Sequence, residues 1–115
     1  MKLATKVMDA DKNIVMLSVS GRIKSGYLAD LQNEFSRLAK GPAVKLILDL
    51  QEVVGIDSTG IGELIKARAD IVAGGGTMIL MGSTPPVEML MKLSGLDQYF
   101  QIVSTYDQAI QLINP

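Results

Sequence analysis

Neither cysteine nor histidine occurs among the 115 residues of this chain. Disulfide bonds, thiol nucleophiles and Ser-His-Asp triads are therefore excluded, as are zinc sites that depend on Cys or His ligands. An excess of basic residues is also missing, since 11 Lys and Arg residues stand against 12 Asp and Glu residues, for a formal net charge of -1. Because no basic face is present to neutralise phosphates, DNA and RNA are not expected partners.

Long apolar runs are the third absence. No stretch reaches the roughly 18 apolar residues that a membrane span needs, and residues 1–6 lead into a mixed segment rather than a secretory leader. We therefore expect no membrane span and a cytoplasmic location. What is present, 48% hydrophobic and 20% charged residues, is typical of a globular protein. At this length we predict one hydrophobic core, and so a single domain over residues 1–115.

Two spacings of apolar residues alternate along the chain. A period of two indicates strands and a period of about 3.6 indicates helices, and together they predict the element order ββαβαβαβα. The predicted strands are residues 3–8, 13–20, 43–50, 77–81 and 100–103, and the predicted helices begin near residues 25, 58, 85 and 106.

The third predicted strand, residues 43–50, is almost continuously apolar, which is typical of a central strand covered on both faces. Short connections between later strands and helices favour right-handed crossovers. We therefore predict an α/β fold with a mainly parallel sheet of about five strands, to which the opening hairpin adds an antiparallel strand. Gly21 is expected to end the second strand, and residues 51–57 to form a loop. Met89 is expected to fill the core, and Leu93 to lie with Val87, Leu90 and Met91 on the third helix.

The segment richest in chemical information is LDLQEVVGIDSTGIG, residues 48–62. Here a buried strand leads to a helix start, which places Ser58 at an exposed helix N-terminus. On residue type alone, Asp57, Ser58 and Thr59 are all good helix caps, and capping is the simplest role for each. The two glycines that follow do not indicate a nucleotide site, because a third glycine and a phosphate-loop lysine are missing.

An enzymatic function of this segment would require further residues that the sequence does not contain. An aspartic protease needs a second Asp-Thr/Ser-Gly loop, which the sequence does not contain. Asp49 and Asp57 have no further carboxylate at a matching strand end to complete a magnesium site. No base, metal set or oxyanion pocket is expected beside Ser58, so we expect neither catalysis nor a cofactor.

Over essentially its whole length the chain resembles the STAS domain family, named for sulphate transporters and anti-sigma factor antagonists. The resemblance rests on LDL at residues 48–50 followed by IDSTGIG at 56–62, and on LSGLDQYF at 93–100 and STYDQA at 104–109. In that family the serine straight after the aspartate receives a phosphate, which implies Ser58 as the phosphorylation site here. The resemblance also implies the STAS fold.

The function implied by the resemblance is that of a bacterial anti-sigma factor antagonist. Such a protein, when unphosphorylated, binds an anti-sigma factor that is also an ATP-dependent serine kinase, and the sigma factor is released. Phosphorylation ends the complex, and a metal-dependent serine phosphatase restores the binding form. ATP and metal belong to these partners. The residues expected to contact partners are Arg22, Lys24, Ile56, Asp57, Ser58, Thr59, Gly60 and Ile61.

One position departs from the family pattern. Antagonists commonly carry an acidic residue and then an aspartate after the glycine near the end of the second strand, whereas this chain has Arg22 and Lys24 there. This exchange of charge favours an alternative role, a STAS subunit of a larger assembly such as a stress-sensing complex or a lipid-transport ATPase. In that role the same loop docks a partner without phosphorylation.

Overall fold

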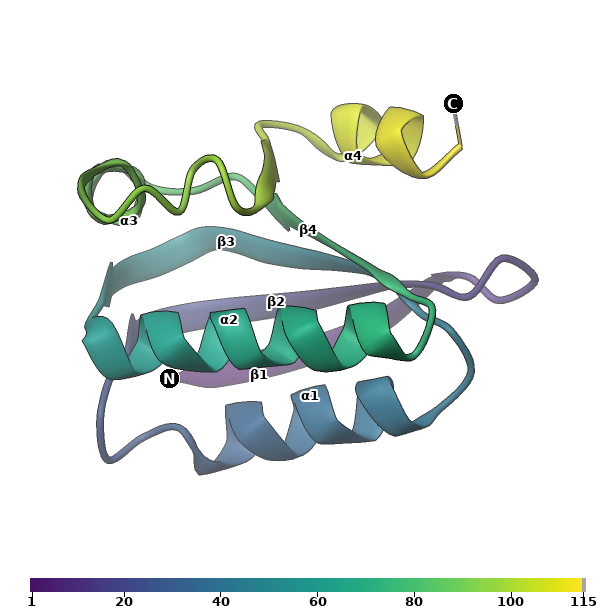
Figure 1. The fold of residues 1–115 in the computed structure, drawn as a ribbon, viewed down its shortest axis with the longest axis horizontal. Coiled ribbons are helices and arrows are strands. Elements are labelled where there is room, and N and C mark those ends of the chain that lie inside the picture. Colours follow the sequence, from purple (N-terminus) through teal and green to yellow (C-terminus); the bar gives the residue numbers. More distant parts are fainter. Residues whose placement is uncertain (115) are drawn as a thin grey trace.

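The computed structural model describes residues 1–114 and has the element order ββαβαβαβα (Figure 1). The predicted order is therefore confirmed. In chain order the elements are β1 (Lys2–Asp9), β2 (Ile14–Ile23), α1 (Ala29–Lys40), β3 (Lys45–Ile56), α2 (Ser58–Ala73), β4 (Thr77–Met81), α3 (Pro85–Leu93), β5 (Gln101–Val103) and α4 (Tyr106–Ile113).

The strands form a five-stranded sheet in the order β1-β2-β3-β4-β5. β1 pairs antiparallel with β2, and every later pair is parallel. β3 is the central strand, and its residues Leu46, Ile47 and Leu48 are fully buried. Apolar side chains pointing to both faces of one strand require cover on both faces. The predicted α/β architecture, mainly parallel with one antiparallel strand, is confirmed.

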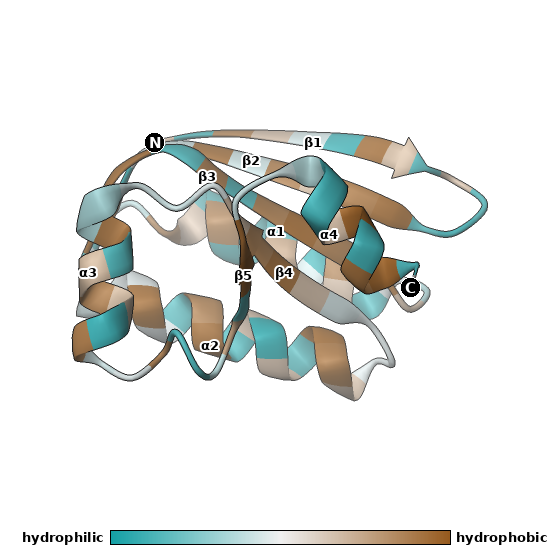
Figure 2. Ribbon diagram, turned by 90° about the horizontal axis from the view of Figure 1, so that it is seen from above, coloured by the Kyte–Doolittle hydropathy of each residue, from teal (hydrophilic) through white to brown (hydrophobic). Residues whose placement is uncertain are grey.

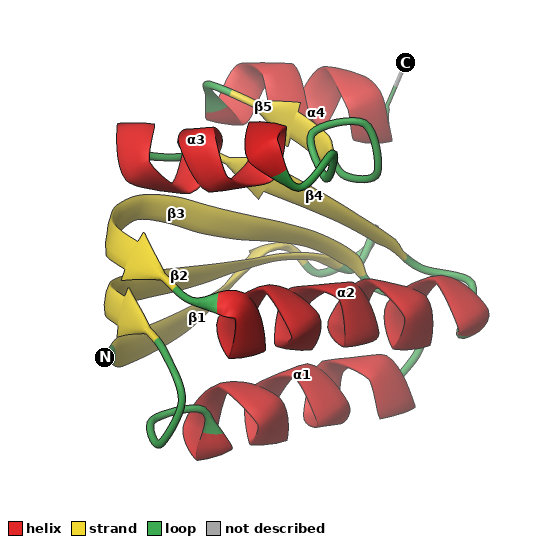
Figure 3. Cartoon of the chain, turned by 60° about the vertical axis from the view of Figure 1, so that its left-hand side comes forward, coloured by secondary structure: helices red, strands yellow, loops and turns green. Residues whose placement is uncertain are grey.

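Helices cover the two faces of the sheet (Figures 1 and 3). α1 and α2 lie side by side along one face, and the larger core cluster fills the space beneath them. α4 packs on the other face, where Ala109 joins Ile47 and Ile79 in a smaller cluster. The hydrophobic residues follow this plan, because β3, β4 and β5 are largely brown in Figure 2 whereas the β1–β2 turn is not. No helix within residues 1–114 is long and apolar enough to cross a membrane.

Two predicted boundaries near the carboxyl ends of β2 and β3 are wrong. β2 continues past Gly21 to Ile23, because Gly21 adopts a φ of +90° at a register shift within the strand. β3 likewise continues through residues 51–56, pairing with the extended β2, and Val53 there is fully buried. Only Asp57 therefore separates β3 from α2, where the sequence indicated a loop.

Candidate functional site

Ser58 is the first residue of α2, directly beyond the carboxyl end of the central strand. The helix cap is the residue before it, since Asp57 has an extended backbone and its carboxylate accepts a hydrogen bond from the Gly60 N–H. Among the three candidate caps, the structure thus assigns the role to Asp57. Ser58 and Thr59 are both exposed in the first turn.

The Asp57 carboxylate connects two segments of the site. Its Oδ1 accepts hydrogen bonds from the Thr59 hydroxyl at 2.6 Å and from the Gly60 N–H at 2.9 Å. Its Oδ2 accepts a hydrogen bond from the Ser25 N–H, just beyond β2, at 3.0 Å. These donors, the Thr59 hydroxyl foremost and then the Ser25 and Gly60 amides, lower the pKa of Asp57 to about 2. The carboxylate is therefore ionised at neutral pH and holds the loop after β2 against the start of α2.

The two adjacent hydroxyl groups differ in availability. The Thr59 hydroxyl donates to Asp57, as described above. The Ser58 hydroxyl has no hydrogen-bond partner within residues 1–114, and its residue is exposed. Ser58 is therefore the residue whose oxygen is free to meet an approaching reagent or partner.

Gly60 allows β2 and α2 to approach closely. A Cβ atom at this position would lie 2.6 Å from the Ile23 carbonyl oxygen and 2.7 Å from the Ile56 Cγ1. The same carbonyl accepts a hydrogen bond from the Asp57 N–H at 3.1 Å. The close approach therefore fixes where Ser58 stands relative to the end of β2. At Gly62, two residues further along α2, a Cβ atom would lie in open space.

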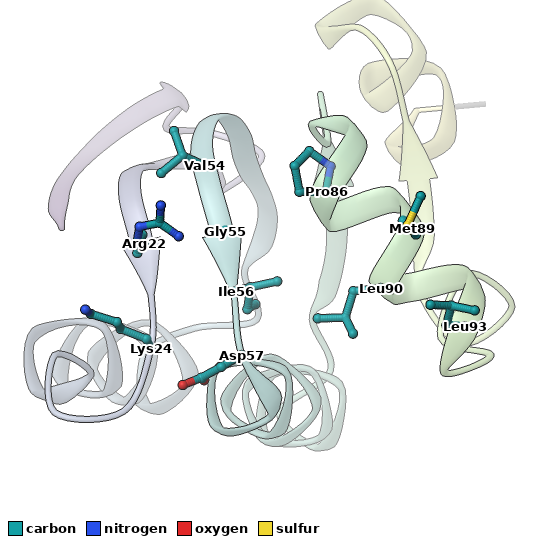
Figure 4. A pocket seen from close by; sticks show the side chains of 10 residues that line it. All are labelled: Arg22, Lys24, Val54, Gly55, Ile56, Asp57, Pro86, Met89, Leu90 and Leu93. Carbon is teal, nitrogen blue, oxygen red and sulfur yellow. The ribbon is translucent and has the colours of Figure 1, made fainter.

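A groove of about 500 Å³ opens beside this corner (Figure 4). The end of β2 forms one wall, the last residues of β3 and Asp57 form the floor, and α3 forms the other wall. Its lining residues are Arg22, Lys24, Val54, Gly55, Ile56, Asp57, Pro86, Met89, Leu90 and Leu93.

The residues expected to contact partners have two kinds of environment. Arg22 and Lys24 are exposed on the groove wall, and Ile56 and Asp57 lie in its floor. Ser58 and Thr59 are exposed at the adjoining helix start. Two residues are instead buried, so they position the corner rather than present a surface: Gly60 and Ile61.

The contribution of α3 to the groove was not predicted from the sequence. Met89 was expected in the core and Leu93 with the apolar residues of this helix, yet they are 65% and 81% exposed. The buried residues of this helix are Val87 and Met91, on the opposite face. A partial signal was available, because Glu88 and Lys92 leave most of the circumference of this short helix apolar, so it cannot bury all of its apolar side chains against one sheet. Which of them stay exposed was not indicated.

A family model described as the STAS domain matches residues 5–109, so the chain belongs to the STAS domain family. A protein of Thermotoga maritima, named as a candidate anti-sigma factor antagonist, is 30% identical over 67 residues. The aligned region covers 58% of this chain and 59% of that protein. The match thus spans less than two thirds of the relative's length.

Solved structures share the fold over nearly the whole chain. The crystal structure of a candidate anti-sigma factor antagonist from Thermotoga maritima has a TM-score of 0.87 and 23% identity, covering 98% of this chain and 95% of that one. The anti-sigma factor antagonist SpoIIAA in its unphosphorylated form has a TM-score of 0.80 and 19% identity, covering 97% and 96%. The phosphorylated form of the Bacillus cell fate determinant SpoIIAA has a TM-score of 0.75 and 18% identity, covering 98% and 100%. These likenesses confirm the predicted STAS fold.

Proposed function

We propose that this chain is an anti-sigma factor antagonist switched by phosphorylation of Ser58. The unphosphorylated form binds an anti-sigma factor serine kinase, and the sigma factor is released. The kinase transfers the γ-phosphate of ATP to the Ser58 oxygen, and the complex separates. A metal-dependent serine phosphatase hydrolyses the phosphoserine and restores the binding form. The chain performs no catalytic step in this cycle and needs no cofactor, because ATP and metal are used by its partners.

The observation that carries the proposal is the unengaged hydroxyl of Ser58. It lies exposed in the first turn of α2, and the neighbouring Asp57 is the helix cap. On residue type alone, Ser58 or Thr59 could equally have been the cap. Phosphorylation therefore breaks no hydrogen bond of the described fold. A capping serine would have exposed its oxygen only by giving up a helix amide.

The surroundings of Ser58 tolerate a phosphate in the free protein but not in a complex. A phosphoserine carries about -1.5 to -2 charges, and at a helix N-terminus it faces the positive end of the helix dipole. A partner packed over a neutral Ser58 would instead have to desolvate this charge beside the ionised Asp57. Such a penalty is on the order of several kcal/mol, enough to separate a modest interface. The switch then needs no change of fold.

The comparisons support this proposal. The Thermotoga relative, which aligns with this chain over 67 residues, is named as a candidate anti-sigma factor antagonist. SpoIIAA has been solved both unphosphorylated and phosphorylated, and both forms have the fold described here. A domain of this fold thus keeps its architecture in the two states, as the proposed switch requires.

The test is the position of the phosphate. The purified chain is incubated with ATP and the anti-sigma factor kinase of the same organism, and the product is analysed by tandem mass spectrometry. We expect one phosphate, on Ser58, in the wild type and in Thr59→Val, and none in Ser58→Ala. Phosphate on Thr59 with Ser58 unmodified would overturn the proposal.

A further inference from the structure

The groove beside Ser58 concentrates apolar side chains that the fold leaves uncovered. Val54 in the last part of β3 is 56% exposed, and Met89 and Leu93 on α3 are 65% and 81% exposed. All three line the same groove, and Figure 4 shows that they come from its floor and from its α3 wall. Single exposed apolar residues are ordinary, but a contiguous group rimmed by polar residues marks an interaction surface.

The charge left uncommitted in this groove is positive. Its one acidic side chain, Asp57, already accepts hydrogen bonds from Thr59, Gly60 and Ser25. The basic side chains Arg22 and Lys24 are exposed, and neither has a carboxylate within ion-pair distance in the part of the chain that the structure describes. The groove therefore offers two unpaired cations in a chain whose net charge is -1.

Each of the two cations has a close neighbour within the chain. The Arg22 guanidinium lies against Gly55, where a Cβ atom would come within 3.1 Å of its Nη1. The Lys24 ammonium stands 5.0 Å from the centre of the Tyr27 ring, a cation–π arrangement. Both basic residues belong to the β2 side of the groove, and α3 lies on the other side (Figure 4). A ligand with carboxylates along one edge and apolar side chains along the other matches this arrangement.

We propose that the groove binds an acidic, apolar segment of the protein partner, with its carboxylates on Arg22 and Lys24 and its apolar side chains against Val54, Met89 and Leu93. The inference rests on the proposed function, which supplies a protein partner over Ser58. A membrane surface fits less well, because binding to anionic lipids generally uses clusters of about four to eight Lys and Arg residues. A small molecule also fits less well, since Met89 and Leu93 project into solvent rather than enclose a cavity.

The proposal is tested with two synthetic helical peptides that share the same leucine and phenylalanine positions. One carries glutamate and the other lysine at every polar position. Each is titrated up to about millimolar concentration into the isotope-labelled full chain, and the backbone amide shifts of Gly55, Ile56 and Leu90 are followed by NMR. Neither kinase nor ATP is present. We expect saturable shifts of these amides with the glutamate peptide and not with the lysine peptide.

Matched variants separate the groove from general charge. Arg22→Glu/Lys24→Glu should lower the affinity for the glutamate peptide by about tenfold, and this variant should bind the lysine peptide. The control Lys6→Glu/Lys12→Glu makes the same change of net charge at exposed residues outside the groove. Its affinity for the glutamate peptide should stay within about twofold of the wild-type value.

The apolar half of the surface has its own pair of variants. Leu93→Ser should lower the affinity for the glutamate peptide. The variant should remain folded, because Leu93 is 81% exposed. Leu112→Ser, at an exposed position on α4, should leave its affinity unchanged.

Several results would overturn the proposal. They are equal binding of the two peptides, no saturable shift in the groove, or equal weakening by the two double charge variants. Binding of phosphatidylglycerol vesicles through Arg22 and Lys24, with no peptide binding, would assign the groove to membranes instead. The titrations contain no kinase, so their outcome does not depend on phosphorylation. If the glutamate peptide binds but the kinase reaction leaves Ser58 without phosphate, this inference stands and the proposed switch is refuted.

Discussion

Replacing Gly60 with alanine should destabilise the fold, whereas the same replacement at Gly62 in the same helix should stabilise it. At Gly60 the new methyl group would lie 2.6 Å from the Ile23 carbonyl oxygen and 2.7 Å from the Ile56 Cγ1. Ile23 is fully buried at the end of β2, so its backbone cannot swing aside as a long side chain would. At Gly62 no heavy atom lies within 4 Å of the new methyl group.

The magnitude follows from two opposing effects. Alanine is favoured over glycine in a helix interior by about 1 kcal/mol, and this gain applies at both positions. Overpacking a close-packed site costs about 1–3 kcal/mol, and this applies at Gly60 alone. Gly62→Ala should therefore raise the free energy of unfolding by about 0.5–1 kcal/mol. Gly60→Ala should lower it by as much as about 2 kcal/mol, and the difference between the variants isolates the close approach.

Urea denaturation followed by circular dichroism measures both values. The urea midpoint should fall for Gly60→Ala and rise for Gly62→Ala, with the slope of free energy against urea unchanged. Because Gly60 also sets the position of the helix start, its variant should shift the amide resonances of Ser25 and Asp57, whose hydrogen bonds hold the corner. Equal stabilisation by both alanines would refute the reasoning, since it would mean that the ends of β2 and α2 separate without cost.

The remaining predictions concern the residues around the proposed phosphate. Ser58→Ala should stay within about 0.5 kcal/mol of the wild-type stability, because Asp57 is the cap, and should bind the kinase persistently while Ser58→Asp binds weakly. Equal affinities of all three proteins in calorimetry would contradict the switch and favour the assembly-subunit role. Thr59→Val removes the foremost cause of the low pKa of Asp57, so an NMR titration should find that pKa above its wild-type value of about 2. Because the folded pKa lies below the unfolded value of about 3.9, the stability contributed by Asp57 is present above about pH 4 and lost as the pH falls towards about 2; Thr59→Val should lose less in that window, and an unchanged pKa would contradict the assigned cause. In the chain phosphorylated at Ser58, Lys24→Asp should raise the second pKa of the phosphate above the wild-type value, because a nearby cation favours the dianion. Superimposable phosphorus NMR titrations at low salt would show that Lys24 does not act on the phosphate.

The element order and the central strand could be predicted because each depends on a pattern within one segment. The almost continuous apolar residues of β3 require cover on both faces of the strand. The alternation of apolar and polar residues in β2 indicates that one of its faces is more exposed to solvent than the other. The IDSTGIG segment likewise marked the corner at Ser58, because the change from a buried strand to a helix start is local in the sequence.

The features that could not be predicted from the sequence depend on contacts between segments. Gln51 and Glu52 look like loop residues, yet they remain in β3, where Glu52 pairs with Ser20 of β2 and Val53 pairs with Gly21. The choice of Asp57 as the cap depends on its extended backbone and on the Ser25 amide, which lies 32 residues away in the chain. The exposure of Leu93 depends on which face of α3 meets β3. None of these is encoded within a single window of sequence.

The absence of a loop between β3 and α2 determines how Ser58 can be presented to an enzyme. Many phosphorylated serines lie in flexible segments that a kinase draws into its cleft as an extended peptide. Ser58 instead stands at a folded corner, where Asp57 is the sole connecting residue. The Asp57 carboxylate accepts one hydrogen bond from the loop after β2 and two from its own helix. A kinase acting here has to accommodate the intact domain. Recognition would then depend on three-dimensional shape, and neither a linear consensus nor an excised peptide would reproduce it.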